Sequence, residues 1–106
     1  MIIGGNTDAQ FGKMLLVGLG GVYVEAFRDV ELRLCPITKA DAGDMLSQLK
    51  SHDLITNNGR STAMLASLLV KVSKLLVDNE RISELDLNPV IVRGKAYDVV
   101  DIRMIA

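Results

Sequence analysis

Residues 82–105, with the sequence ISELDLNPVIVRGKAYDVVDIRMI, decide the fold class. Leucines alternate with polar residues from Glu84 to Asn88, and a second run, 96–105, follows the segment Arg93-Gly94-Lys95. Alternation with a period of two is typical of a half-buried strand, and glycine between two such runs favours a turn. We therefore expect an antiparallel β-hairpin in which 96–105 forms one long return strand.

Two helical segments are expected before the hairpin. Thr38 followed by Asp41 resembles a capping box, which predicts a helix that begins there and ends near Ser51. Ser61 or Thr62 is expected to cap a second helix. Its apolar residues recur at intervals of three and four and form one stripe: Met64, Leu65, Leu68, Leu69, Val72, Leu75 and Leu76.

The first third of the chain is expected to be β structure. The apolar runs 1–3, 14–17, 22–27 and 30–35 predict strands, and the polar segment 6–12 predicts a turn. Strands that are segregated from helices favour the α+β class, with a mainly antiparallel sheet and two helices on one face. The 106 residues are expected to form a single domain, 1–106, because a chain of this length builds one core.

Composition excludes several classes of protein. The net charge of −1 and the aromatic content of 4% argue against binding to nucleic acid. No apolar run is long enough to span a bilayer, and the basic start of a signal peptide is missing, so we expect no membrane partner. The single cysteine, Cys35, fits a reducing compartment, and we expect a cytoplasmic protein. The hydrophobic content of 49% suggests a surface that a partner covers.

The polar face of the hairpin carries candidate metal ligands. Asp86 and Asn88 share one face of the outgoing strand, and the expected turn places Asn88 near Asp101 on the return strand. Carboxylate and amide oxygens are the ligands that Mg²⁺ prefers, with water and phosphate oxygens as the others. The spacing alone leaves two interpretations open, a magnesium site or a solvated strand face with a surface ion pair.

The glycine segment Gly18-Leu19-Gly20-Gly21 is also ambiguous by itself. Tyr23 stands where a dinucleotide fingerprint needs a third glycine, and the lysine of a P-loop is missing. The glycines fit a tight turn or a backbone approach to phosphate. His52 follows a predicted helix and is interpreted as a solvated side chain rather than a catalytic group.

The segments 84–89 and 99–103, together with 2–5 and 17–25, resemble the ATP-grasp domain of ADP-forming acyl-CoA synthetases. Succinyl-CoA synthetase β-subunits are more distant relatives. The resemblance implies the C-terminal lobe of an ATP-grasp domain that binds ATP or ADP with Mg²⁺. It implies that Asn88 and Asp101 hold the metal, with Asp86 as a third candidate. It further implies nucleotide contacts from Gly20, Gly21, Glu25 and Arg33.

The resemblance is imperfect, and it leaves two functions open. Ala9 and Lys13 replace prolines that the family usually carries, and Arg60 is displaced from the family's Arg-Gly pair. The first expectation is a nucleotide-binding lobe of an enzyme that converts acyl-CoA, ADP and phosphate to acid, CoA and ATP. That lobe is expected to be inactive alone and to need a partner subunit or further ATP-grasp and CoA-binding domains. The alternative is a non-catalytic remnant that serves as an interaction or oligomerisation module, including a homo-oligomer.

Overall fold

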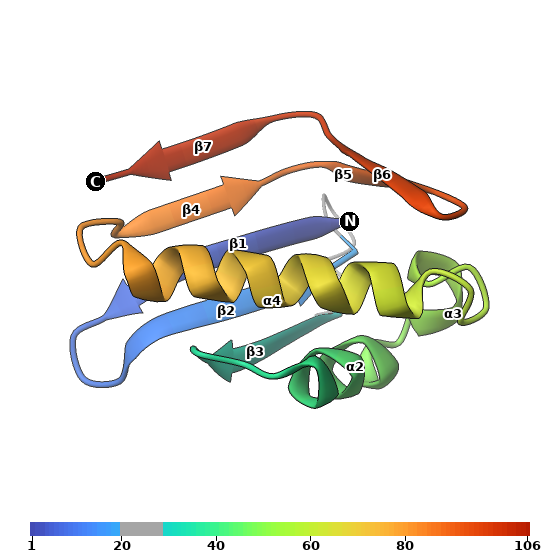
Figure 1. The fold of residues 1–106 in the computed structure, drawn as a ribbon, viewed down its shortest axis with the longest axis horizontal. Helices are drawn as coiled ribbons and strands as arrows, with labels where there is room; N and C mark the ends of the chain where they lie inside the picture. Colours follow the sequence, from blue (N-terminus) through green and yellow to red (C-terminus); the bar gives the residue numbers. More distant parts are fainter. Residues whose placement is uncertain (20–28) are drawn as a thin grey trace.

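The computed structural model describes residues 1–19 and 29–106 (Figure 1). Within these ranges the chain forms strands and helices with the following bounds: β1 Ile2–Asp8, β2 Gly12–Gly18, β3 Val30–Leu34, α2 Lys39–Gln48, α3 His52–Ile55, α4 Thr62–Asp78, β4 Glu84–Leu87, β5 Val90–Arg93, β6 Ala96–Val99 and β7 Ile102–Ile105. The predicted strand 22–27 lies outside the described residues.

The strands form a five-stranded sheet in the order β3-β2-β1-β4-β7 and a two-stranded sheet of β5 and β6. Every strand pairing among the described residues is antiparallel. Helices α2 and α4 lie on one face of the larger sheet (Figure 1). The predicted α+β class, the antiparallel sheet and the two longer helices are confirmed, and α3 adds one short turn of helix.

The helix boundaries follow from local capping. Thr38 is the N-cap of α2, and it forms the predicted capping box, because its hydroxyl accepts from Asp41 N–H while the Asp41 carboxylate accepts from Thr38 N–H. Hydrogen bonding from Thr38, chiefly from its backbone N–H, stabilises the charged carboxylate and lowers the pKa of the Asp41 carboxyl. Ser61 is the N-cap of α4, but its hydroxyl donates to Gly94 C=O at 2.6 Å rather than capping the helix. The start of α4 is thereby tied to the turn between β5 and β6.

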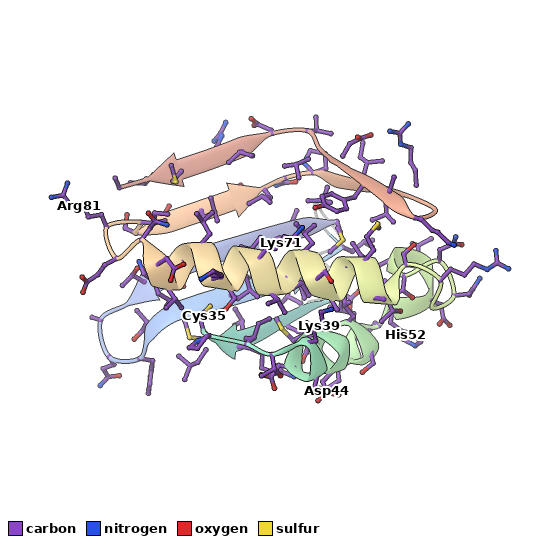
Figure 2. All side chains as sticks on the ribbon, viewed as in Figure 1. Cys35, Lys39, Asp44, His52, Lys71 and Arg81 are labelled. Atoms are coloured by element: carbon purple, nitrogen blue, oxygen red, sulfur yellow. The ribbon has the colours of Figure 1, made fainter. Side chains whose placement is uncertain are left out.

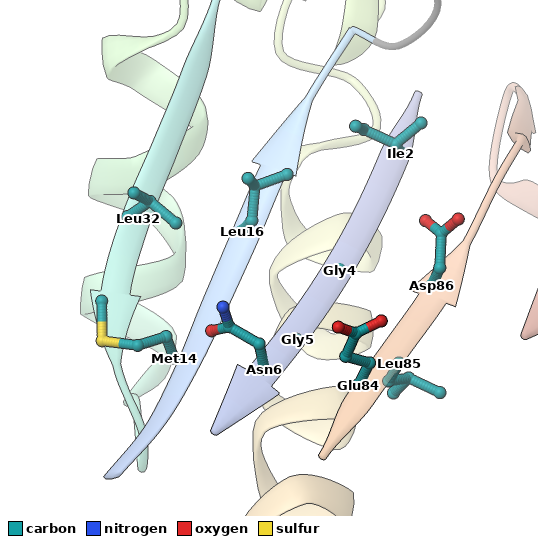
Figure 3. A pocket seen from close by; sticks show the side chains of 10 residues that line it. All are labelled: Ile2, Gly4, Gly5, Asn6, Met14, Leu16, Leu32, Glu84, Leu85 and Asp86. Carbon is teal, nitrogen blue, oxygen red and sulfur yellow. The ribbon is translucent and has the colours of Figure 1, made fainter. Parts of the chain in front are cut away.

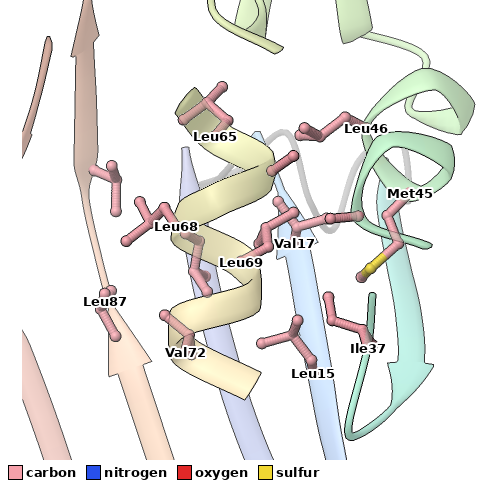
Figure 4. Packing of buried hydrophobic residues seen from close by; sticks show 14 of the residues in the cluster. Leu15, Val17, Ile37, Met45, Leu46, Leu65, Leu68, Leu69, Val72 and Leu87 are labelled. Atoms are coloured by element: carbon pink, nitrogen blue, oxygen red, sulfur yellow. The ribbon is translucent and has the colours of Figure 1, made fainter. Parts of the chain in front are cut away.

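The core lies between α4 and the sheet (Figure 4). The predicted stripe of α4 is buried at Leu65, Leu68, Leu69, Val72 and Leu76, and it faces Leu15 and Val17 of β2. Each fully buried leucine contributes about 2 kcal/mol from removal of apolar surface from water. No buried side-chain nitrogen or oxygen in the described ranges lacks a hydrogen-bond partner. None of the helices there is long and apolar enough to cross a bilayer.

Two sequence predictions about the strands were wrong. The segment Asn6–Asp8 is part of β1 rather than a turn, because all three residues pair with β2 and Asn6 also pairs with β4. The expected return strand is divided into β6 and β7, with Val100 and Asp101 between them. The interruption lies opposite Pro89, which has no N–H to donate to a ladder. The register nevertheless continues, since Val90 is opposite Val99 and Leu87 is opposite Ile102.

The predicted alternation of β3 is present, but its apolar side faces away from the helices. Glu31 and Arg33 are opposite the buried Val17 and Leu15, so they share the helix-covered face. Leu32 and Leu34 therefore lie on the uncovered face, where they are 50% and 48% exposed. A period of two identifies the two faces of a strand, but it does not say which one a helix covers.

Gly5 is required where β1 passes under α4. A Cβ at this position would come within 2.4 Å of Leu76 Cδ1 and 3.2 Å of its Cγ, and Leu76 is fully buried. We predict that Gly5→Ala lowers the free energy of unfolding by about 1–3 kcal/mol through overpacking. Gly4→Ala is the matched control, because its Cβ would meet only ordinary contacts, the nearest at 3.6 Å. Urea denaturation checks both variants, and equal losses of stability would contradict the explanation.

Asp29 holds the segment between α2 and α3. Its carboxylate is buried and accepts from Lys50 N–H at 2.5 Å, from Ser51 N–H at 3.0 Å and from the Ser51 hydroxyl. We predict that Asp29→Ala lowers the free energy of unfolding by about 2–3 kcal/mol, because three partly buried hydrogen bonds lose their acceptor.

Asp8 provides the control for this prediction, since its carboxylate also accepts two backbone N–H groups, from Gln10 and Phe11, but in an exposed turn. Water replaces the lost acceptor there, so Asp8→Ala should lower the free energy of unfolding by less than about 1 kcal/mol. Thermal or urea unfolding compares the two variants, and a larger loss for Asp8→Ala would refute the role of burial.

Candidate functional site

The face of the sheet opposite the helices is open (Figure 3). It holds a hollow of about 360 Å³. The lining comes from β1, β2, β3 and β4, and consists of Ile2, Gly4, Gly5, Asn6, Met14, Leu16, Leu32, Glu84, Leu85 and Asp86. Side chains of alternate residues project into this face, while the residues between them pack under α4. The hollow is thus built from the half of each strand that the core does not use.

The open face has an apolar part and a charged part. Leu32, Leu16, Gly4 and Asp86 follow one another across β3, β2, β1 and β4, because each is directly opposite the next. Gly4 has no side chain, so the floor of the hollow is low between the leucines and the carboxylate (Figure 3). Such a surface fits a ligand with a flat apolar portion and a polar or cationic portion.

The charged part extends along the hairpin to the predicted metal ligands. Asn88 N–H donates to Asp101 C=O at 3.1 Å, so the backbones of these two residues are adjacent, as the sequence predicted. Asp86 lies two residues before Asn88, and directly opposite Arg103. The structure therefore brings the three predicted ligands, Asp86, Asn88 and Asp101, to one end of β4 and β7.

Arg103 is the cation of this cluster. Its Nε lies 4.0 Å from Asp101 Oδ2, and the side chains of Arg103 and Asp101 are 82% and 62% exposed. A pair this long and this exposed contributes little to stability. The carboxylate of Asp101 is therefore available to another cation.

The donor set fits magnesium only when other oxygens complete the coordination. Among the described residues, no three histidine, cysteine or carboxylate side chains are placed to hold a metal ion. Two carboxylates and one amide at an exposed site match the habit of Mg²⁺, which keeps several waters and binds substrate phosphates. A metal ion held by this cluster would therefore need water or phosphate oxygens as further ligands.

Of the four predicted nucleotide contacts, the structure describes only Arg33, and it does not lie on this face. Gly20, Gly21 and Glu25 lie outside the described residues. Arg33 lies on the helix-covered face, where its Nη1 is 3.1 Å from Glu31 Oε1. The role of Arg33 in nucleotide binding stays a prediction, and its position on the helix-covered face does not support that role. The His52 side chain is 45% exposed, and its Nδ1 lies 2.9 Å from Asp53 Oδ1, as a histidine near the surface can.

Sequence reasoning missed the apolar half of the face. The period of two does predict that Glu84 shares one side of its strand with Asp86, and both residues line the hollow. Met14 and Leu16 carried no such signal, because they belong to a continuous apolar run from 14 to 17 that is equally consistent with burial on both faces.

Comparison with known proteins supports the class of protein that this fold and face define. The family model described as ATP-grasp domain matches residues 1–106. The ADP-forming acetate–CoA ligase I of Archaeoglobus fulgidus is 42% identical over 109 residues, which cover 99% of this chain and 16% of that protein. Subunit beta of ADP-forming acetate–CoA ligase II of Pyrococcus furiosus is 41% identical, with 99% of this chain and 48% of the subunit covered.

Solved structures of similar proteins support the same family. The dinucleotide-forming acetyl-coenzyme A synthetase 1 of Ca. Korarchaeum cryptofilum, in its apo form, superposes with a TM-score of 0.90 at 41% identity, covering 98% of this chain and 51% of that one. The same protein in complex with coenzyme A and Mg-AMPPCP gives a TM-score of 0.88. This chain therefore belongs to the ATP-grasp family, and its resemblance to ADP-forming acyl-CoA synthetases is confirmed. It spans about half the length of the Pyrococcus subunit and about a sixth of the Archaeoglobus ligase.

The location of the predicted metal ligands on the open face leads to a spectroscopic prediction. Mn²⁺, which accepts the same oxygen ligands as Mg²⁺, should broaden the amide resonances of Asp86, Asn88 and Asp101 when it is added with ADP. Resonances of α2, on the other side of the sheet, should keep their widths. Two-dimensional NMR of the labelled chain measures both sets. Broadening centred on α2 or α3 instead would contradict the location of the site.

Proposed function

We propose that the chain is a nucleotide-binding and Mg²⁺-binding lobe of an ADP-forming acyl-CoA synthetase. The observation that carries the proposal is the open sheet face, on which an apolar half stands beside the carboxylate of Asp86 and the adjacent Asn88 and Asp101. The apolar half suits a nucleobase and ribose, and the carboxylate end suits the Mg²⁺ of a Mg-nucleotide.

The resemblance supplies the reaction within this proposal. Acyl-CoA, ADP and phosphate would be converted to free acid, CoA and ATP. Catalysis of phosphoryl transfer rests mainly on positioning and on charge stabilisation around the phosphates. The residues here would contribute the metal side of that arrangement. Asn88 and Asp101 would hold Mg²⁺, Asp86 would support them, and water and phosphate oxygens would fill the remaining positions.

The open face also implies a partner for catalysis. Phosphoryl transfer needs a site that excludes water, and this face is uncovered in the described part of the chain. A second surface, from further domains or from another subunit, would have to close over the nucleotide. The relatives that are described as subunits are consistent with such an assembly. The comparisons give no support to the alternative of a non-catalytic module.

Titration calorimetry of the chain with ADP or ATP, with and without Mg²⁺, tests the proposal. We predict Mg²⁺-dependent binding, and we predict that Asp101→Ala weakens it by about tenfold or more through loss of a charged ligand. Asp44→Ala is the matched control, since Asp44 is an exposed aspartate on α2, on the helix side of the sheet (Figure 2).

Three outcomes are distinguishable. Mg²⁺-dependent heat that Asp101→Ala removes and Asp44→Ala preserves supports the proposal. Binding that is indifferent to Asp101→Ala refutes the metal assignment while leaving the nucleotide face. The absence of heat at millimolar nucleotide refutes nucleotide binding by this chain alone.

A further inference from the structure

Strand β7 is an edge of the five-stranded sheet, and its side chains are unusually apolar for an edge. All of its residues, Ile102–Ile105, are exposed, with Ile102 at 60%, Met104 at 59% and Ile105 at 54%. Natural proteins usually protect an edge strand with charges, proline or a covering segment, because its unpaired N–H and C=O groups are a template for another strand. A strand of this composition at an edge predicts a pairing partner.

The helix layer does not reach this edge. Ile102 and Met104 lie opposite Leu87 and Leu85, so they are on the side of the sheet where the helices pack. Leu85 and Leu87 are buried, whereas their neighbours on β7 are not. Figure 1 shows why, since α4 lies over β1 and β2 while β7 is the outermost strand beyond β4. The exposed side chains of Ile102 and Met104 therefore form an apolar ledge beside α4.

We propose that the ledge and the edge are covered by a second copy of this chain, through antiparallel pairing of β7 with the partner's β7 around a two-fold axis. The axis passes beside Ile102, which lies opposite the partner's Ile102. Asp101 is then opposite the partner's Arg103, and Arg103 is opposite the partner's Asp101. On the ledge side, Val100, itself 59% exposed, lies opposite the partner's Met104.

Charge selects this register from its alternatives. The alternative registers differ from this one by steps of two residues. A step of one residue would place the same side chains on opposite faces of the sheet in the two copies. A pairing centred on Arg103 would place two guanidinium groups directly opposite each other, and a pairing centred on Asp101 would do the same with two carboxylates. Like charges in opposite positions destabilise a sheet, whereas opposite charges stabilise it. Centring on Ile102 is the arrangement that pairs both charges and also joins apolar residues on the other face.

Arg103 of β7 and Asp101 just before it can both reach such contacts. Asp101 and Arg103 are mostly exposed and are only 4.0 Å apart within the chain, a weak interaction. Within residues 1–19 and 29–106, the strand at the other end of the sheet is β3, which has a similar order of charges in Glu31 and Arg33. There the pair already closes at 3.1 Å, and its side chains are only 22% and 33% exposed. The comparison favours β7 over β3 as the pairing edge.

The proposed dimer does not interfere with the candidate metal site. The two-fold axis is perpendicular to the sheet, so the open faces of both copies lie on the same side of one continuous sheet. The carboxylate of Asp101 has enough lone pairs to accept from a guanidinium and to bind a cation. Formation of the proposed dimer does not depend on nucleotide binding, so the two proposals can be tested separately.

Charge reversal tests the proposal with the 106-residue chain. We expect the wild type to dimerise in sedimentation velocity across a micromolar concentration series. Asp101→Arg gives a chain with two arginines at the contact, and Arg103→Asp gives a chain with two aspartates. Each variant alone should dimerise at least about tenfold more weakly, because both opposite pairs become like pairs. An equimolar mixture of the two should regain the dimer, because both pairs are again opposite.

Cross-linking tests the register. In a Cys35→Ala background, Ile102→Cys places two thiols opposite each other at the Cα separation of about 5.5 Å that an antiparallel pair provides, and a disulfide accommodates this distance. Met104→Cys is the matched control. Its two copies would be separated by four residues along the strand, about 13 Å, which is beyond the reach of a disulfide.

The results decide the proposal in either direction. A dimer that charge reversal weakens, that the mixture restores and that Ile102→Cys traps supports β7 pairing. A monomer at all concentrations overturns it, as does a dimer that is insensitive to both charge reversals. Faster cross-linking by Met104→Cys than by Ile102→Cys overturns the register. Circular dichroism of each variant separates these outcomes from loss of the fold.

Discussion

The packing of α4 against β1 and β2 is the interaction on which the rest of the structure depends. Its apolar stripe is buried over five positions, and the strands beneath it contribute Ile3, Leu15 and Val17. The contact is so close that β1 has Gly5 where any side chain would enter the space of Leu76. Because α4 and α2 build the core on one side of the sheet, the side chains on the opposite face are not needed for the core.

That one-sided arrangement explains the character of the open face. Strands that are buried on one face only can place side chains for binding on the other without disturbing the core. Leu16, Leu32 and Asp86 lie there at no cost to the packing of Leu15, Val17 and Leu85 on the reverse. The same arrangement leaves β7 bare, since α4 is not wide enough to cover the sheet beyond β4.

The hairpin from β4 to β7 connects the core with the site. Its two halves share one register, but the ladder is interrupted at Pro89 and Val100, where it passes from the larger sheet to the smaller one. Asn88 and Asp101 occupy that interruption. Side chains at the end of a regular ladder are exposed and still have a fixed backbone beneath them, which is favourable for ligands that must meet a phosphate-bound metal ion.

The sequence by itself determined the elements that rest on local patterns: the stripe of α4, the capping box at Thr38, the alternation of β4 and the closeness of Asn88 to Asp101 across the hairpin. It also carried the family resemblance, because that depends on the order and spacing of residues. Only the tertiary structure decided which face of each strand is covered. It placed Arg33 under the helices and Leu32 in the open, and it drew Asn6–Asp8 into β1. The physical reason is that periodicity defines two faces of a strand from its own residues, whereas burial of one of them depends on a helix that is distant in the sequence.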